Sequence, residues 1–296
     1  MPFRFSSDER VGAGLQRIAG EQTVSGLAEI DDPRLPRDKT VHQVRKRCKR
    51  LRALLRLARG GLGGVYDREN AAVRDAARLL SGTRDVDVMI ATLQGLLDGD
   101  DTQIDSEAVA AIVAELRQLG SPQTNAANDD ARGRLAEFRA AFAALSDRTN
   151  TWKIKGGGVA TLADGFAATY GKARDAMGAA YAHPTPERFH EWRKHAKYHW
   201  YHLQLLRRIW PPVMKTLDSQ ASELADLLGA DHDLAVLAVR LEEISTDESL
   251  RRALIAAAEA RRTELQNAAR ILGARLFLAK PAAWNRTVRK LWKRRG

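Results

Sequence analysis

The residues best suited to chemistry are basic, and they repeat along one short segment of the chain. Between Val41 and Arg59 the sequence has eight lysines and arginines and no acid. Arginine offers a planar fork of donors to two oxygens of one phosphate, whereas lysine supplies a mobile point charge. Such groups at one-turn spacing favour a repeating anion over a single small ligand. On a helical wheel, five basic residues fall within an arc of about 80°: His42, Arg45, Lys49, Arg52 and Arg56.

A second segment repeats this pattern 148 residues later, from 189 instead of 41. VHQVRKRCKRLRALLRL (41–57) aligns without gaps with FHEWRKHAKYHWYHLQL (189–205), and LLSGTRDVDV (79–88) aligns with LLGADHDLAV (227–236) at the same offset. Two separate blocks with one offset, half of the 296 residues, predict an internal duplication. The residues on the equivalent arc of the second helix are His190, Arg193, Lys197, Tyr201 and Gln204.

Both basic rows border the apolar face of their helix instead of lying opposite to it. Val44, Cys48, Leu51 and Leu55 fill the arc beside the first row. A solvated helix usually interleaves acids, because like charges one turn apart repel each other. The alternative is that acids from neighbouring helices neutralise the rows. Because the row is duplicated, we expect the two helices to face each other across a pseudo-twofold axis and to line a positively charged channel.

The rest of the chain is expected to be helical, since its apolar spacing follows the helical period and strand alternation is missing. The acidic, less periodic stretch 98–130 is expected to be partly a surface loop. Gly156-Gly157-Gly158 is the expected linker between a first half, 1–155, and a second half, 156–296. The predicted helices are 8–30, 38–60, 67–98, 129–147, 158–181, 185–209, 213–246, 248–275 and 281–294.

The composition indicates a folded protein with a polyanionic partner. A net charge of +11 favours nucleic acid, an acidic membrane or a phosphate polymer, although a high-GC genome rich in arginine codons gives a similar surplus. Cys48 is the single cysteine, which excludes an intrachain disulfide and favours a reducing compartment. The amino-terminal residues lack the apolar core of a secretion signal, and no run reaches the roughly 18 apolar residues of a membrane span. We therefore expect a cytoplasmic protein.

Two groups of residues invite a catalytic or metal-binding interpretation. His190-Glu191 is followed by a histidine five residues on, so the HExxH zinc pattern fails; His195 and His199 have the i,i+4 spacing of a chelate but lie on or beside the apolar arc. We therefore expect them to pack. Four aspartates could bind magnesium or transfer protons, but helix capping or an ion pair with a channel arginine explains them more simply: Asp85, Asp87, Asp231 and Asp233.

The carboxyl-terminal run of basic residues could bind nucleic acid or an anionic surface. Its simpler interpretation is a frayed terminal helix with solvated charges. The run contains Arg286, Arg289, Lys290, Lys293, Arg294 and Arg295, with Trp284 and Trp292 among them.

At its basic segments the sequence resembles the conserved histidine α-helical domain family, CHAD, over nearly its whole length. The resemblance implies two four-helix bundles related by pseudo-twofold symmetry, with a basic central channel that binds inorganic polyphosphate. It also implies a stand-alone binding module associated with polyphosphate granules. The residues that carry the likeness are His42-x-x-Arg45-Lys46-x-x-Lys49-Arg50-Leu51-Arg52, its copy His190-Glu191-x-Arg193-Lys194-x-x-Lys197, the segment 80–88, and Tyr170-x-x-x-Arg174.

From the two rows and the resemblance together we expect a polyphosphate site with no cofactor, no metal and no catalytic residue. The second row is less charged, with Trp200, Tyr201 and Gln204 at the positions of Arg52, Ala53 and Arg56, so an asymmetric channel is expected. The ExExK motif of a tripolyphosphatase domain is missing. The expected ligands are His42, Arg45, Lys46, Lys49, Arg52, Arg56, Tyr170, Arg174, His190, Arg193, Lys194, Lys197 and Tyr201.

Two other functions remain as alternatives. A nucleic-acid-binding protein would use the same phosphate contacts without sequence preference, but the sequence lacks a recognised reading motif and the stacking aromatics that single strands favour. A phosphatase or phosphotransferase could use His42 or His190 as a nucleophile. A fixed base and a metal-binding acid cluster should accompany that chemistry, and neither is evident in the sequence.

Overall fold

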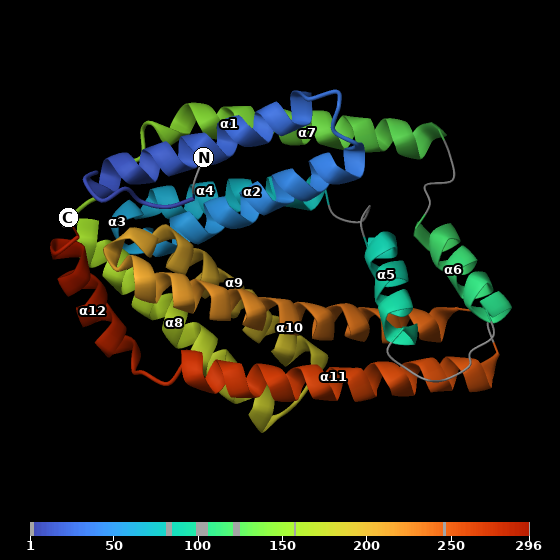
Figure 1. The fold of residues 1–296 in the computed structure, drawn as a ribbon. Coiled ribbons are helices and arrows are strands. Elements are labelled where there is room, and N and C mark those ends of the chain that lie inside the picture. Colours follow the sequence, from blue (N-terminus) through green and yellow to red (C-terminus); the bar gives the residue numbers. More distant parts are fainter. Residues whose placement is uncertain are drawn as a thin grey trace.

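The computed structural model describes residues 3–80, 85–98, 106–120, 125–156, 158–244 and 247–295, and all regular elements among them are helices (Figure 1). The predicted all-α class is confirmed. Within the described residues, no helix is long and apolar enough to cross a membrane. The helices are α1 (Val11–Asp31), α2 (Arg37–Leu57), α3 (Arg59–Leu62), α4 (Gly64–Leu79), α5 (Asp85–Leu97), α6 (Ser106–Gly120), α7 (Asn125–Thr149), α8 (Gly158–Ala182), α9 (Pro186–Leu205), the 3₁₀ helix η1 (Arg207–Ile209), α10 (Pro211–Glu243), α11 (Glu248–Leu276) and α12 (Pro281–Lys293).

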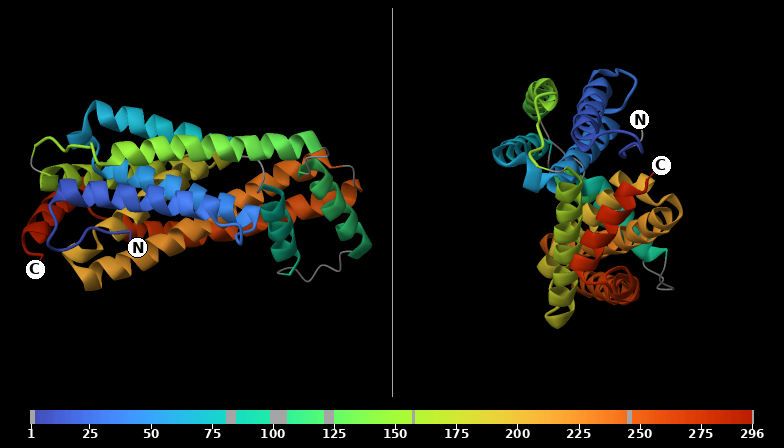
Figure 2. Two further views of the ribbon diagram at one scale, coloured as in Figure 1. Left: turned by 90° about the horizontal axis from the view of Figure 1, so that it is seen from above. Right: turned by 90° about the vertical axis from the view of Figure 1, so that its left-hand side faces the viewer.

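Most helices pack in two sets, one from each half of the chain, while α5 of the first half packs on α10 of the second. In the first set, α1 packs on α2, α2 on α4, α4 on α7, and α7 returns to α1. In the second, α8 packs on α9, α9 on α10 and α10 on α11, while α12 lies along α8 (Figure 1). The chain termini lie at the same end of the molecule (Figure 2), where the rings of Phe5 and Trp292 meet. Because α2 packs on both α8 and α9, the two basic helices meet at the junction of the sets.

Several features of the structure recur at the 148-residue offset, although the duplication itself stays a prediction. α2 ends at residue 57 and α9 at 205, which is the 148-residue offset, and the short α3 at 59–62 corresponds to η1 at 207–209. One side-chain hydrogen bond is also repeated at this offset: Arg52 Nε donates to Asn70 Oδ1 (3.2 Å), and Trp200 Nε1 donates to Asp218 Oδ1 (2.8 Å). The relation of the halves by a pseudo-twofold rotation stays a prediction.

The helices differ from the expectations in three places. The single helix expected at 67–98 is divided into α4 and α5, and α5 packs on α10; Ser81, Gly82 and Thr83, all weak helix formers, separate the two in sequence. The stretch 98–130 contains α6, whose Ile112 and Leu116 are buried one turn apart. The carboxyl-terminal helix is docked instead of frayed.

Burial explains the last two of these differences. Ile112 and Leu116 join an apolar cluster with Leu93 of α5 and residues of α10 and α11, which suffices to hold a short helix despite its acidic surroundings. Val288 and Trp292 of α12 belong to the main core of the protein. Each fully buried leucine or isoleucine contributes roughly 1.5–3 kcal/mol, so a few such residues outweigh weak local propensity.

The close approach of α2 and α8 depends on one glycine. A Cβ atom at Gly165 would lie 2.0 Å from the carbonyl oxygen of Leu57. Any side chain there would therefore push α8 away from the carboxyl end of α2. This contact fixes the position of α2 relative to α8 and, through it, to α9.

Candidate functional site

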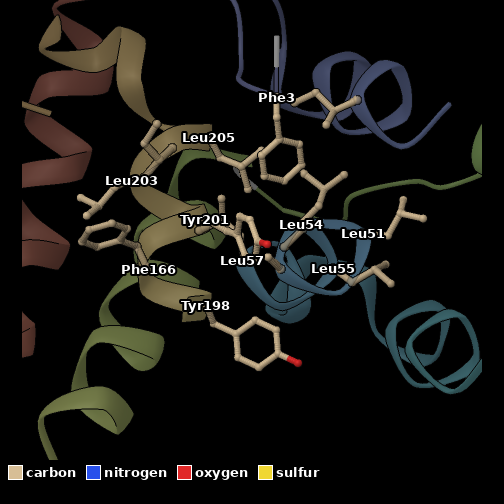
Figure 3. Close-up of a cluster of buried hydrophobic side chains, with 14 of the residues drawn as sticks. Phe3, Leu51, Leu54, Leu55, Leu57, Phe166, Tyr198, Tyr201, Leu203 and Leu205 are labelled. Carbon is tan, nitrogen blue, oxygen red and sulfur yellow. The ribbon is translucent and has the colours of Figure 1, made fainter. Parts of the chain in front are cut away.

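The site is built where α9 crosses α2 near the carboxyl ends of both helices. His202 Nε2 lies 2.9 Å from the carbonyl oxygen of Ala53, a buried contact between the two helices. One residue earlier, Tyr201 packs edge-on against Phe3, with ring centroids 6.0 Å apart, and Figure 3 shows both rings beside the leucines of α2. Because Ala53 has a small side chain, α9 can approach α2 closely here.

Three arginines on the two crossing helices have buried donors without acceptors. Arg50, Arg56 and Arg193 are each half-buried, and the Nε atom of each is buried with no hydrogen-bond partner in the described part of the chain. A buried donor left without a partner costs about 1–3 kcal/mol. By contrast, the neighbouring Arg47 donates to Glu29 at 2.6 Å. We call Arg50, Arg56 and Arg193 the arginine cluster.

Aromatic rings hold two members of the arginine cluster in place. The guanidinium carbon of Arg50 lies 5.2 Å from the ring centroid of Phe3, and that of Arg56 lies 4.3 Å from the centroid of Tyr198. Cation–π contacts orient a guanidinium group without using its N–H donors. The N–H donors of Arg50 and Arg56 other than the buried Nε therefore stay available for the oxygens of an anion.

The electrostatics of the site favour a bound anion. Burial lowers the pKa of Arg50 and of Arg193, although the attraction of Asp233 opposes this for Arg193. The pKa of Lys46 is lowered by burial and then by repulsion from Arg50 and Arg47, while Glu29 opposes the shift. Each shift means that the charged form is less stable here than in water, so an anion that neutralises these groups gains free energy.

Arg45 and Arg52 lie on the side of α2 that faces α4. Arg45 Nη1 donates to the carbonyl oxygen of Leu80 at 2.7 Å, and Arg52 Nε donates to Asn70 Oδ1 at 3.2 Å. Both side chains are half-buried. Since a guanidinium group has five N–H donors, each keeps donors beyond these contacts.

A cavity lies at each end of the α2 row. At the amino end, His42 lines a cavity of about 730 Å³ between α2, α5, α10 and α11, whose wall also carries the carboxylates of Asp38, Asp87 and Asp233. At the carboxyl end, Arg56 lines a cavity of about 410 Å³ between α2, α3, α8 and α9. Lys49 is exposed between these ends.

Comparison with known proteins identifies the family. Residues 22–242 match the sequence model of the CHAD domain. The chain belongs to the CHAD domain family. The structure titled PptA from Streptomyces chartreusis is similar to this chain, with a TM-score of 0.59 and 16% identity, over 92% of this chain and 100% of that one. The CHAD domain from the plant Ricinus communis is also similar, with a TM-score of 0.56, 16% identity, and 90% of each chain covered. These likenesses support the fold, and no curated protein matches the sequence.

The second basic row of this CHAD domain is more varied than the first. Lys197 is half-buried on α9, while His190 is exposed and its ring centroid lies 4.6 Å from that of His232. The pKa of His190 is lowered by burial and by the charges of Arg193 and Lys194. Lys194 forms an ion pair with Glu191, which also lies 2.8 Å from Nε2 of His195. Lys194, which follows Arg193 of the second row, is therefore paired with an acid of its own helix.

Two expected ligands lie elsewhere in the CHAD domain. Tyr170 has 0% of its surface exposed, and its hydroxyl donates to the carbonyl oxygen of Ala279 at 2.9 Å. Tyr170 is thus part of the core beside α12, and its expected role as a surface ligand was wrong. Arg174 is exposed one turn later on α8 and close enough to Tyr170 for its charge to act on that hydroxyl's pKa. The structure does not bring this pair to the arginine cluster.

Arg50 was missing from the expected ligands, although the motif contains it. On a helical wheel of α2 alone, the basic arc runs from Arg52 to His42, and Arg50 falls outside it. The signal that could have found it is Ala53, because a small residue in a row of large ones marks the place where another helix crosses. Arg50 precedes Ala53 by three residues and so lies on the same face of α2.

The buried histidines have structural roles. His199 is enclosed by the rings of Phe166, Tyr170 and Phe277, and burial lowers its pKa to about 3. Burial also lowers the pKa of His202 to about 4. Both are therefore neutral at neutral pH, and His199 packs as the sequence predicts. Within the described residues, no group of three histidines, cysteines or acids could hold a metal ion.

The aspartates considered for catalysis differ in their surroundings. Asp231 is buried and accepts hydrogen bonds from Arg262 Nε at 3.1 Å and Gln266 Nε2 at 2.7 Å, and burial raises its pKa. This network joins α10 to α11 and is structural. Asp87 and Asp233 line the cavity at the amino end of α2. The side chain of Asp85 lies outside the described residues.

Proposed function

We propose that this CHAD domain binds inorganic polyphosphate along α2 and α9 and catalyses no reaction on it. The observation that carries the proposal is the arginine cluster, in which three half-buried guanidinium groups have buried Nε donors without acceptors. If these guanidinium groups pair with phosphate oxygens, the charge-assisted hydrogen bonds would offset the free-energy cost of burying the groups without partners. Guanidinium groups neutralise phosphate charge but supply no nucleophile, so the cluster is suited to binding.

The length of the basic row supports a polymeric ligand. His42 and Arg56 lie at the two ends of the row on α2 and are 14 residues apart (42 to 56). At a rise of about 1.5 Å per residue, they are about 21 Å apart along the helix axis. A single phosphate cannot contact both ends, whereas a phosphate chain can. The same binding would place the protein on polyphosphate granules in the cytoplasm.

Titration calorimetry with long-chain polyphosphate at near-physiological salt tests the proposal, with orthophosphate, DNA and RNA as competitors. The variant Arg193→Gln should weaken binding by about 10- to 100-fold, because one charge-assisted hydrogen bond contributes about 1.5–3 kcal/mol. The matched control is Lys215→Gln, which removes one positive charge from an exposed position on α10. Affinity should also fall steeply with salt concentration as counterions are released.

Two results would contradict the proposal. Equal competition by DNA or RNA would mean that the basic surface recognises phosphate backbones in general. An affinity of Arg193→Gln equal to that of Lys215→Gln would mean that net charge, and not the arginine cluster, determines binding. Release of orthophosphate from polyphosphate during the titration would contradict the non-catalytic part alone.

A further inference from the structure

The cavity at the carboxyl end of α2, which we call the α2-end pocket, is formed by elements of both halves. Arg56 of α2, Arg59 of α3, Lys172 of α8 and His195 of α9 all line it. The row of cations on α2 therefore ends in a pocket instead of on open surface. Its volume of about 410 Å³ exceeds the space that one phosphate group needs, so it can hold a phosphate with part of the chain attached.

The donors of the α2-end pocket are held ready for an anion. Arg59 lies with its guanidinium carbon 4.7 Å from the ring centroid of Tyr66, as Arg56 lies 4.3 Å from that of Tyr198. The Nε atom of Arg56 is one of the buried donors without a partner. Gly60 and Gly63 also line the pocket, and a Cβ at either position would meet nothing within 4 Å. The wall at these glycines is therefore open to a ligand.

The charges of the pocket still favour an anion when its acids are included. Three permanent cations face it, against the carboxylates of Asp67 and Asp164. Asp164 already accepts hydrogen bonds from Arg289 at 2.8 Å and Asn285 at 2.6 Å on α12. Its negative charge is thus partly neutralised from outside the pocket. His195 adds no permanent charge, because burial lowers its pKa, although Glu191, 2.8 Å from its Nε2, opposes that shift.

We propose that the α2-end pocket binds the terminal phosphate of a polyphosphate chain whose internal phosphates lie along α2. This rests on the proposed function and adds a site for the chain end. A terminal phosphate carries about −1.5 to −2 charges at neutral pH, as a phosphomonoester does, while an internal phosphate carries one. The terminal phosphate, with its larger charge, therefore gains more binding free energy than an internal phosphate where guanidinium and ammonium groups converge from several helices.

Comparison of linear tripolyphosphate with cyclic trimetaphosphate tests this inference, because both contain three phosphates and only the linear form has ends. The titrations use the full chain and the variants Arg59→Gln and Lys172→Gln, with Lys46→Gln as a control on α2 but outside the pocket. Each pocket variant should lower the affinity for tripolyphosphate about tenfold, because one charged contact is lost. The affinity for trimetaphosphate should fall less than twofold. Lys46→Gln should weaken both ligands by similar factors.

Equal effects of the pocket variants on both ligands would overturn the inference, since the pocket would then hold internal phosphates. Failure of tripolyphosphate to bind, while long chains bind, would overturn it as well. Lys172 is exposed, so Lys172→Gln should fold normally even if Arg59→Gln loses its contact with Tyr66. Failure of the proposed function would be a different result: the unaltered protein would then not bind long-chain polyphosphate at all.

Discussion

Replacement of Arg50 by methionine should raise the stability of the unliganded protein and weaken its binding of polyphosphate. Arg50 is half-buried, its Nε is buried without a partner, and repulsion from its charge contributes to the lowered pKa of Lys46. Methionine keeps the apolar stem of the side chain and removes the charge and the unmet donor. A residue kept for binding at a cost in stability should show these two opposite effects.

The expected stability change follows from two terms. Removal of the unmet buried donor gains about 1–3 kcal/mol, and loss of the cation–π contact with Phe3 costs about 0.5–1 kcal/mol. The net gain is about 1 kcal/mol. The entropy of unfolding is about 2.1 cal/mol/K per residue, so for 296 residues this gain raises Tm by about 1.6 °C. Affinity for polyphosphate should fall about 10- to 100-fold.

Scanning calorimetry with and without long-chain polyphosphate measures both effects. The matched control is Arg47→Met on the same helix, because Arg47 pairs with Glu29 at 2.6 Å and both side chains are largely buried. Loss of that partner should destabilise the protein by about 1–3 kcal/mol, the cost of leaving a buried acceptor unsatisfied, and leave polyphosphate affinity nearly unchanged. If Arg50→Met lowers Tm as Arg47→Met does and binds polyphosphate normally, Arg50 is structural and the reasoning about unmet donors fails.

Three further predictions concern the fold that positions the site. His199 and His202 have pKa values lowered by burial to about 3 and about 4, so the unfolded chain, which titrates near 6.5, binds more protons between these limits. Unfolding free energy should therefore decrease from about pH 6.5 downwards, by about 2 kcal/mol per histidine at pH 5, and urea titrations that give a flat profile would contradict this. Gly165→Ala should destabilise the protein by about 3 kcal/mol or more, because its Cβ would collide with the backbone of Leu57. Gly178→Ala, where a Cβ meets nothing within 4 Å, should stabilise α8 by up to about 1 kcal/mol in thermal unfolding.

The helices that carry the site could be predicted because their signals are local. α9 begins at Pro186 after Thr185, whose side chain caps the helix, and α2 follows Pro36. Apolar residues at helical spacing then give each helix its buried face. The same spacing places Arg45 and Arg52 beside the core, and both do reach from α2 to the α4 side. Each of these conclusions needs only the residues of a single helix.

The arginine cluster could not be predicted in full because it depends on two helices at once. The place where α9 crosses α2 is set by Gly165, by Ala53 and by His202, which are far apart in the sequence. Arg50 belongs to the site only because of that crossing. Tyr170 shows the opposite error, since a motif suggested a ligand while the packing of α12 on α8 places its ring in the core.

The repeated hydrogen bond between helices shows how two corresponding helices can carry unequal basic rows. Arg52 donates to Asn70 in the first half, and Trp200 donates to Asp218 at the equivalent positions of the second. The contact that holds the helix is kept, because an indole N–H can replace a guanidinium N–H as donor. The positive charge is lost, because indole is neutral. Gln204 likewise replaces Arg56, so the second row lacks charge where the first ends in the α2-end pocket. A phosphate chain bound at this junction should therefore lie closer to α2 than to α9.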